Sequence, residues 1–109
     1  MIDRGATSDA LRRFKDQGSD LTRPMAIDFF LAAPTKEACS AIADRASAIG
    51  FLASVEQDDT GGWTCYCTKV LVPSLKTVLD HEELLDQIAR AHGGHGDGFG
   101  SYGNAEERS

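Results

Sequence analysis

The sequence has no long apolar run, and this absence excludes a membrane-spanning protein. None of its hydrophobic stretches approaches the roughly 20 consecutive apolar residues that a transmembrane helix needs. The first residues, Met1 to Gly5, also lack the apolar centre of a secretory signal peptide. We therefore expect a cytoplasmic protein with no membrane segment.

Cysteine is scarce as well. The 109 residues include three cysteines, Cys39, Cys65 and Cys67. So small and odd a number cannot form a disulfide framework, which agrees with a reducing compartment. Cys65-x-Cys67 is not the C-x-x-C spacing of a zinc knuckle, and no second pair follows at a suitable distance. We therefore expect structural cysteines, with no metal site and no cofactor.

Basic residues are outnumbered by acidic ones. The chain has 11 Lys and Arg against 17 Asp and Glu, which gives a net charge of −6. Such a balance offers no electrostatic footprint for phosphate backbones, so we expect no direct binding of nucleic acid. It suits a basic protein partner instead. The alternative is that the charge only keeps the protein in solution.

The pattern of residues that are present predicts an α+β fold. Two strand–helix crossovers around a tight hairpin give a ferredoxin-like βαββαβ sandwich, an antiparallel sheet with two helices on one face plus an N-terminal helix. The predicted domains are an N-terminal helical extension over 1–23, the α+β domain over 24–103 and a disordered tail over 104–109. The predicted elements are a helix over 8–17, a strand over 25–33, a helix over 35–50, strands over 51–57 and 63–72, a helix over 75–92, and a loop or last short strand over 96–102.

Alternation and helical spacing predict which faces are buried. In the first strand, Met25, Ile27, Phe29 and Leu31 share the better core face, and Phe30 on the other face is expected to pack against the N-terminal helix. The last helix has a predicted buried stripe and a predicted solvated acidic part, which is the candidate surface for a basic partner. The stripe is Val78, Leu84, Leu85, Ile88 and Ala89, and the acidic part is Asp80, Glu82, Glu83 and Asp86.

No catalytic residue is marked by the sequence. Cys65, Cys67, His95 and Asp97 could together form a metal-binding, ligand-binding or enzymatic site, which we keep as the alternative function. Asp97 is also typical of a turn residue. The glycine pattern over 98–103 matches G-x-G-x-x-G, but no helix can follow it to hold a phosphate, so we interpret it as coincidental.

Three stretches carry a resemblance to a known family. They are residues 11–20, which end in Gly-Ser-Asp, the predicted helix that ends at residues 48–51 together with the strand after it, and residues 96–102. These stretches are similar to the RraB family, the regulators of ribonuclease E activity B. Asp97, Gly98, Phe99 and Gly100 match the Tyr-Asp-Gly-Trp-Gly motif of that family, with Gly96 in place of its Tyr and Phe99 in place of its Trp. Long acidic ends, found in the enterobacterial regulators, are represented after the motif only by Glu106 and Glu107.

The resemblance implies a ferredoxin-like α+β sandwich and a non-catalytic protein that binds and inhibits ribonuclease E, and so modulates RNA turnover. We interpret the four motif residues as structural, with Phe99 anchoring the last strand and the glycines letting it approach its neighbour. Two alternatives stay open. One is the small enzyme or ligand-binding domain described above, and the other is a structural homodimer that covers the exposed face of its own sheet.

Overall fold

The computed structural model describes residues 4–101, 103 and 104. The described chain forms α1 (Arg4–Asp16), β1 (Met25–Ala33), α2 (Lys36–Ala48), β2 (Leu52–Gln57), β3 (Trp63–Leu71), α3 (Leu75–Arg90) and β4 (His95–Gly100). The strands form one sheet in the order β2-β3-β1-β4, and every neighbouring pair is antiparallel. The predicted ferredoxin-like α+β arrangement is therefore confirmed, and residues 96–100 belong to a strand.

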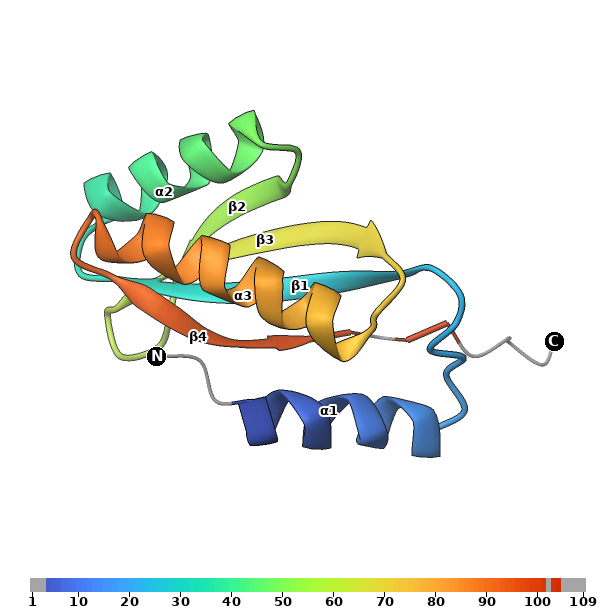
Figure 1. Ribbon diagram of the computed structural model, residues 1–109. Helices are drawn as coiled ribbons and strands as arrows, with labels where there is room; N and C mark the ends of the chain where they lie inside the picture. The colour runs from blue at the N-terminus through green and yellow to red at the C-terminus, as the bar shows by residue number, and fades with distance from the viewer. Residues whose placement is uncertain (1–3, 102, 105–109) are drawn as a thin grey trace, which may run out of the picture.

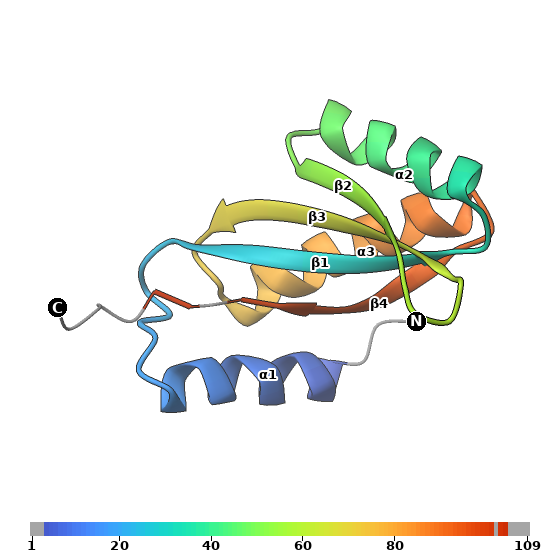
Figure 2. The ribbon, with the colours of Figure 1, turned by 180° about the vertical axis from the view of Figure 1, so that it is seen from behind.

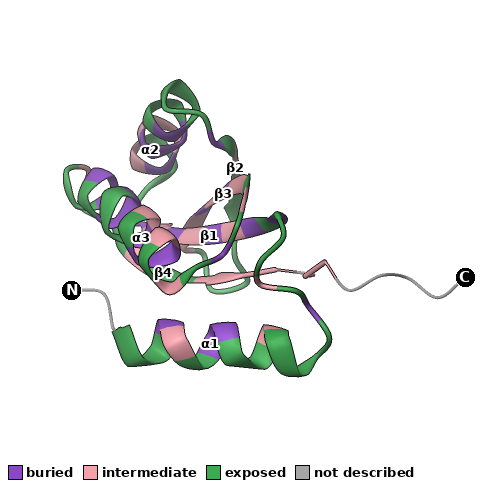
Figure 3. Cartoon of the chain, turned by 45° about the vertical axis from the view of Figure 1, so that its right-hand side comes forward, coloured by how far each residue is buried: buried purple, intermediate pink, exposed green. Residues whose placement is uncertain are grey.

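Helices cover one face of this sheet and leave the other face open. Figure 1 shows α2 and α3 in front of the strands, and Figure 2 shows the opposite face with no helix across it. The helix α1 lies below β4 and alongside α3, so it extends the helical layer past the sheet edge. Its burial agrees, because buried and half-buried residues of α1 face the rest of the molecule while its outer side is exposed (Figure 3).

The core lies between the sheet and the helices, as alternation in β1 predicts. Met25, Ile27, Phe29 and Leu31 are all at most 3% exposed. Cys65 and Cys67 of β3 lie opposite Leu31 and Phe29, point to the same side of the sheet and are completely buried. Full burial of a side chain such as that of Ile27 or Phe29 contributes about 1.5–3 kcal/mol to folding.

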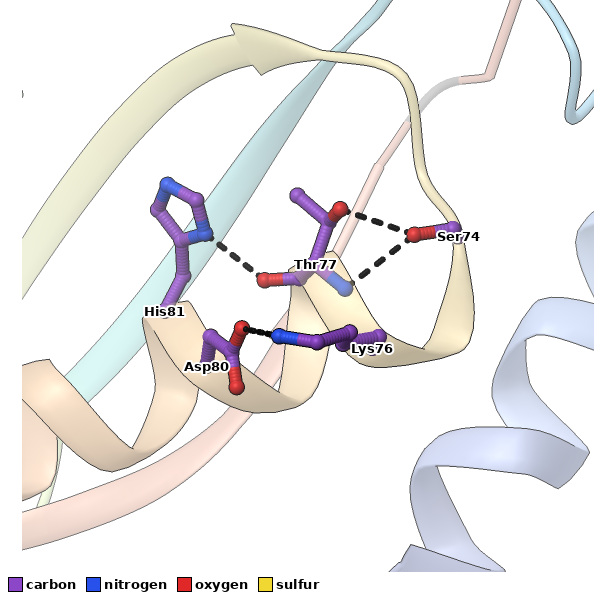
Figure 4. A network of polar contacts seen from close by, with 5 residues as sticks. All are labelled: Ser74, Lys76, Thr77, Asp80 and His81. Carbon is purple, nitrogen blue, oxygen red and sulfur yellow. Dashed lines mark hydrogen bonds and ion pairs between the residues drawn. The ribbon is translucent and has the colours of Figure 1, made fainter.

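Local sequence signals set the ends of the elements. Thr35 is the N-cap of α2 and accepts a hydrogen bond from the Ala38 amide at 3.1 Å. Ser74 caps α3 in the same way through the Thr77 amide at 3.1 Å (Figure 4). In the hairpin turn, an Asp58 carboxylate oxygen accepts from the amides of Thr60 and Gly62 at 2.9 Å. These contacts satisfy backbone donors that have no partner within a helix or ladder.

Several sequence predictions are wrong in detail. The first helix begins at Arg4 rather than at residue 8, so Ser8 lies within it. Leu84 of α3 is 43% exposed, whereas Glu82 and Asp86 are 9% and 7% exposed. The reason is tertiary: α1 and β4 pack against a side of α3 that a helix covering the sheet alone would leave in water.

The C-terminal segment is attached to the loop after α1. The Asn104 side-chain amide donates to the carbonyl of Asp20 at 2.8 Å and to those of Arg23 and Pro24 at 3.2 Å, while its oxygen accepts from the Asp20 amide at 2.7 Å. The disordered tail expected from residue 104 therefore does not include Asn104. Residues 105–109, with Glu106 and Glu107, lie outside the described residues.

Candidate interaction surface

The family-motif residues Asp97, Gly98, Phe99 and Gly100 form a β-bulge at the sheet edge. Phe29 of β1 lies opposite Phe99, and Leu31 lies opposite Gly96, so β4 has one more residue than β1 over this interval. Gly98 has a φ of +98°, a left-handed conformation that glycine adopts without a Cβ clash. A bulge of this kind bends an edge strand and redirects its side chains.

The rest of the motif packs closely against its neighbours. The Phe99 ring lies 6.0 Å from that of Phe14 on α1 and 6.1 Å from that of Phe29, measured between ring centroids. A Cβ on Gly100 would lie 3.2 Å from Cζ of Phe30, which is tighter than ordinary contact. These contacts support the interpretation of Phe99 as the anchor of the strand and of Gly100 as a position of close approach.

Asp86, predicted to be a solvated partner contact, joins α3 to β4 instead. Its carboxylate accepts from the Gly96 amide and from Nε of Arg90, both at 2.7 Å. Burial acts to raise the pKa of Asp86, but the hydrogen bonds from Gly96 and Arg90 outweigh it and hold this pKa below the ordinary value of 3.8. The carboxylate is therefore ionised and has a structural role in holding the motif strand.

Glu82 is buried against α1. Its Oε1 accepts a hydrogen bond from the Thr7 hydroxyl at 2.5 Å. Burial raises the pKa of Glu82 above its ordinary value of 4.5, and the hydrogen bond from Thr7 opposes that rise. Glu82 thus links two helices and offers little surface to a partner.

Asp80 and Glu83 are the two residues of the predicted acidic set that lie at the surface. Asp80 pairs with Lys76 at 2.8 Å, and both side chains are more than half exposed (Figure 4). The neighbouring His81, by contrast, is half-buried, donates from Nδ1 to the Thr77 carbonyl at 2.7 Å and stacks on Phe29. The structure therefore divides the four acidic residues into two buried and two exposed.

The alternative site of Cys65, Cys67, His95 and Asp97 is not assembled. The cysteines lie in the core on β3, His95 and Asp97 are exposed on β4, and β1 lies between these strands. The described residues contain no group of three or more His, Cys, Asp or Glu side chains placed to hold a metal ion.

The thiols themselves are in an apolar setting. The sulfurs of Cys65 and Cys67 are 3.6 Å apart, and the hydrogen bond between them, together with burial, raises the pKa of Cys65. Burial, with a smaller effect of Cys65, raises the pKa of Cys39 to about 11. The hydrogen bond between Cys65 and Cys67 lowers the pKa of Cys67. Buried thiols in such a setting pack as small apolar residues.

The open face of the sheet carries residues that were not among the predicted site residues. The register places Phe30 of β1 directly opposite Tyr66 of β3, and their rings meet edge to face with centroids 5.4 Å apart. Phe30 therefore packs against Tyr66 and not against the N-terminal helix. Leu52 and Val70 on the same face are 77% and 65% exposed. The alternation of β1 and β3 already indicated this face, but only the pairing register brings these rings together.

A hollow opens on this face beside the aromatic pair. It has a volume of about 320 Å³ and is lined by Asp28, Phe30, Tyr66, Gly100 and Ser101. Asp28 accepts a hydrogen bond from the Thr68 hydroxyl at 2.5 Å, and the Ser101 hydroxyl donates to the Ala26 carbonyl at 2.5 Å. The last residue of the family motif thus borders an accessible, partly apolar depression.

Comparison with known proteins places the chain in a family. Within the described residues, no helix is both long and apolar enough to cross a membrane. None of the curated proteins matches the chain. The model of the RraB family, described as regulator of ribonuclease activity B, matches residues 4–101, which include all the helices and strands described above. The chain therefore belongs to the RraB family.

Proposed function

We propose that this protein is a non-catalytic regulator that binds a ribonuclease in the cytoplasm and restrains it, with ribonuclease E as the enzyme to test first. The family match over residues 4–101 is the observation that carries the proposal. Because the match extends from α1 to the end of β4, the regulatory fold includes the N-terminal helix as well as the sandwich.

The placement of the ionisable groups supports binding rather than catalysis. Asp86 and Glu82 are hydrogen-bonded to neighbouring elements, and the three cysteines lie in the core. Catalytic acids and bases work in accessible sites with a substrate within reach. These buried groups are instead committed to the fold, which leaves surface contacts as the means of action.

Two surfaces could meet the ribonuclease. The first is the open face of the sheet, where the exposed Leu52 and Val70 lie on the same side as the half-buried aromatic pair of Phe30 and Tyr66. The second is the outer side of α3, with Asp80 and Glu83. We favour the open face, because Lys76 already offsets the charge of Asp80 and because exposed apolar and aromatic groups dominate the energetics of protein interfaces.

The direct test is inhibition of RNA cleavage by purified full-length ribonuclease E. We expect the purified protein to slow cleavage of a fluorescent RNA in a dose-dependent and saturable way, and to bind the ribonuclease in the absence of RNA. The same RNA without ribonuclease serves as the control, and we expect the protein not to bind it. Unchanged cleavage with the protein in large excess would contradict the proposal for ribonuclease E.

A further inference from the structure

We propose that the hollow on the open sheet face is an arginine-binding site, which takes a guanidinium group from an extended, basic segment of the protein partner. This inference rests on the proposed function, because it specifies the chemistry by which the partner is recognised. The hollow, about 320 Å³ in volume, combines a carboxylate with two aromatic rings. That combination suits a group that is both cationic and planar.

The walls of the hollow match the guanidinium in detail. Phe30 and Tyr66 are both half-buried and line the hollow, and an edge-to-face pair leaves ring faces on which a cation can stack. The Thr68 hydroxyl donates to Oδ1 of Asp28 at 2.5 Å, which fixes the carboxylate. A carboxylate still has further acceptor positions, and its geometry fits the fork of a guanidinium. Lysine is a compact and strongly hydrated charge, so it fits such a stacked site less well.

The charge of the whole face selects a basic partner. The register and alternation of the strands place Asp28, Glu56 and Asp97 on this side. The described strand residues on this face include no Lys or Arg. Lys69 of β3 lies on the helical side of the sheet, over the Phe51 ring. Within the part of the chain that the structure describes, none of these three carboxylates forms an ion pair, so together they attract a cationic segment.

The same charges disfavour two other occupants of this face, RNA and a second copy of this chain. Paired aromatic residues on central strands of an open sheet also stack bases in some RNA-binding domains. Here, however, the phosphates would meet carboxylates, and among the described strand residues of this face they would meet no Lys or Arg, only the exposed His95. A second copy bound across a two-fold axis would bring this acidic face against itself. A basic protein segment is the occupant that both the rings and the charges fit.

An extended segment also suits the shape of the surface. Side chains of a strand alternate, so every second residue of an extended peptide can point at the sheet. Leu52 and Val70, exposed on the same face, offer apolar contacts to such a segment beyond the hollow. Peptides in which arginine alternates with valine therefore imitate the proposed partner.

The experiment is a titration of the ¹⁵N-labelled full chain, followed by NMR, with a capped decapeptide of alternating arginine and valine. We expect the largest shifts at Asp28, Phe30, Tyr66, Gly100 and Ser101, and weaker binding of the matched lysine peptide. Asp28→Asn keeps an acceptor for Thr68 but removes the charge, and Tyr66→Leu removes a ring. Each is expected to weaken binding about tenfold, which corresponds to about 1.4 kcal/mol.

Asp44→Asn is the matched control, because it removes one exposed charge from α2 on the other side of the sheet. It should leave binding unchanged. Equal weakening by Asp28→Asn and Asp44→Asn would overturn the proposal in favour of general attraction. NMR shifts confined to α3 would also overturn the proposal, as would tighter binding of single-stranded RNA at the same residues. A homodimer that is detected by light scattering and that Tyr66→Leu dissociates would overturn it too.

The failure of this inference can be separated from failure of the proposed function. If the wild-type protein inhibits the ribonuclease and Asp28→Asn inhibits equally well, the arginine site is wrong and the regulatory function stands. If the arginine peptide binds at the hollow but no ribonuclease is inhibited, the site stands and the proposed function is wrong.

Discussion

At the scale of single residues, Gly98 shows that a family motif can specify a backbone conformation. A Cβ at Gly98 would meet no atom within 4 Å, so space does not explain the glycine. Its φ of +98° does, because L-residues pay about 1–2 kcal/mol to adopt a left-handed conformation. We therefore expect Gly98→Ala to lower the free energy of unfolding by about that amount, measured by urea denaturation with Trp63 fluorescence.

Gly98→Asn tests whether the positive φ or a lack of room for a side chain explains the glycine. Asparagine tolerates left-handed φ better than alanine although it is larger. We expect it to destabilise the protein less than alanine does. The opposite order would show that crowding, and not φ, explains the glycine.

Asp86 connects the motif strand to α3 through an ionised carboxylate, and its removal has a predictable pH dependence. Asp86→Ala leaves the Gly96 amide without its acceptor and should lower the free energy of unfolding by about 1.5–3 kcal/mol near neutral pH. Since the folded-state pKa is depressed below 3.8, the stabilisation is present above that value and is lost as pH falls below it. The difference between wild type and variant should therefore shrink below about pH 4.

The control for Asp86 is Asp80→Ala on the same helix. Asp80 is exposed and pairs with an exposed Lys76, so its removal should change stability by no more than about 1 kcal/mol. If both variants lose the same stability, helix propensity and not the bond to Gly96 is responsible.

At the scale of elements, the contact between α1 and α3 should weaken as pH rises. The folded-state pKa of Glu82 is raised above 4.5, so the folded protein binds a proton more readily than the unfolded chain. Stability is then lost as pH rises from about 4.5 through the raised pKa. Glu82→Gln retains an acceptor for Thr7 but cannot ionise.

We expect the free energy of unfolding of Glu82→Gln to increase relative to that of the wild type as pH rises through this range. The hydrogen-exchange protection of α1 should follow the same trend. Glu83→Gln, exposed on the adjacent position, should show no such trend. A constant difference between Glu82→Gln and wild type at every pH would refute the linkage.

At the scale of the whole molecule, the sequence predicted what depends on local pattern. Alternation predicted the buried face of β1 with the bounds that the structure has, and the helix predicted over 35–50 corresponds to α2. The solvated role of Glu82 and Asp86 was wrong, because that side of α3 is covered by α1 and β4, which helical periodicity does not reveal. The bulge at Gly98 and the hollow between Phe30 and Gly100 depend on strand register, and a single sequence does not specify register over such separations.

Substitution of exposed apolar residues on each of the two sides of the molecule tests which side binds the partner. Leu52→Ser together with Val70→Thr changes the open sheet face, and Leu84→Ser changes the outer side of α3. All three positions are exposed, so stability should change by no more than about 0.5 kcal/mol per substitution. If the open face is the contact surface, the double variant loses ribonuclease inhibition and Leu84→Ser retains it. The reverse result would move the interface to α3 with Asp80 and Glu83, because loss of inhibition without loss of stability can arise only at a surface that the partner covers.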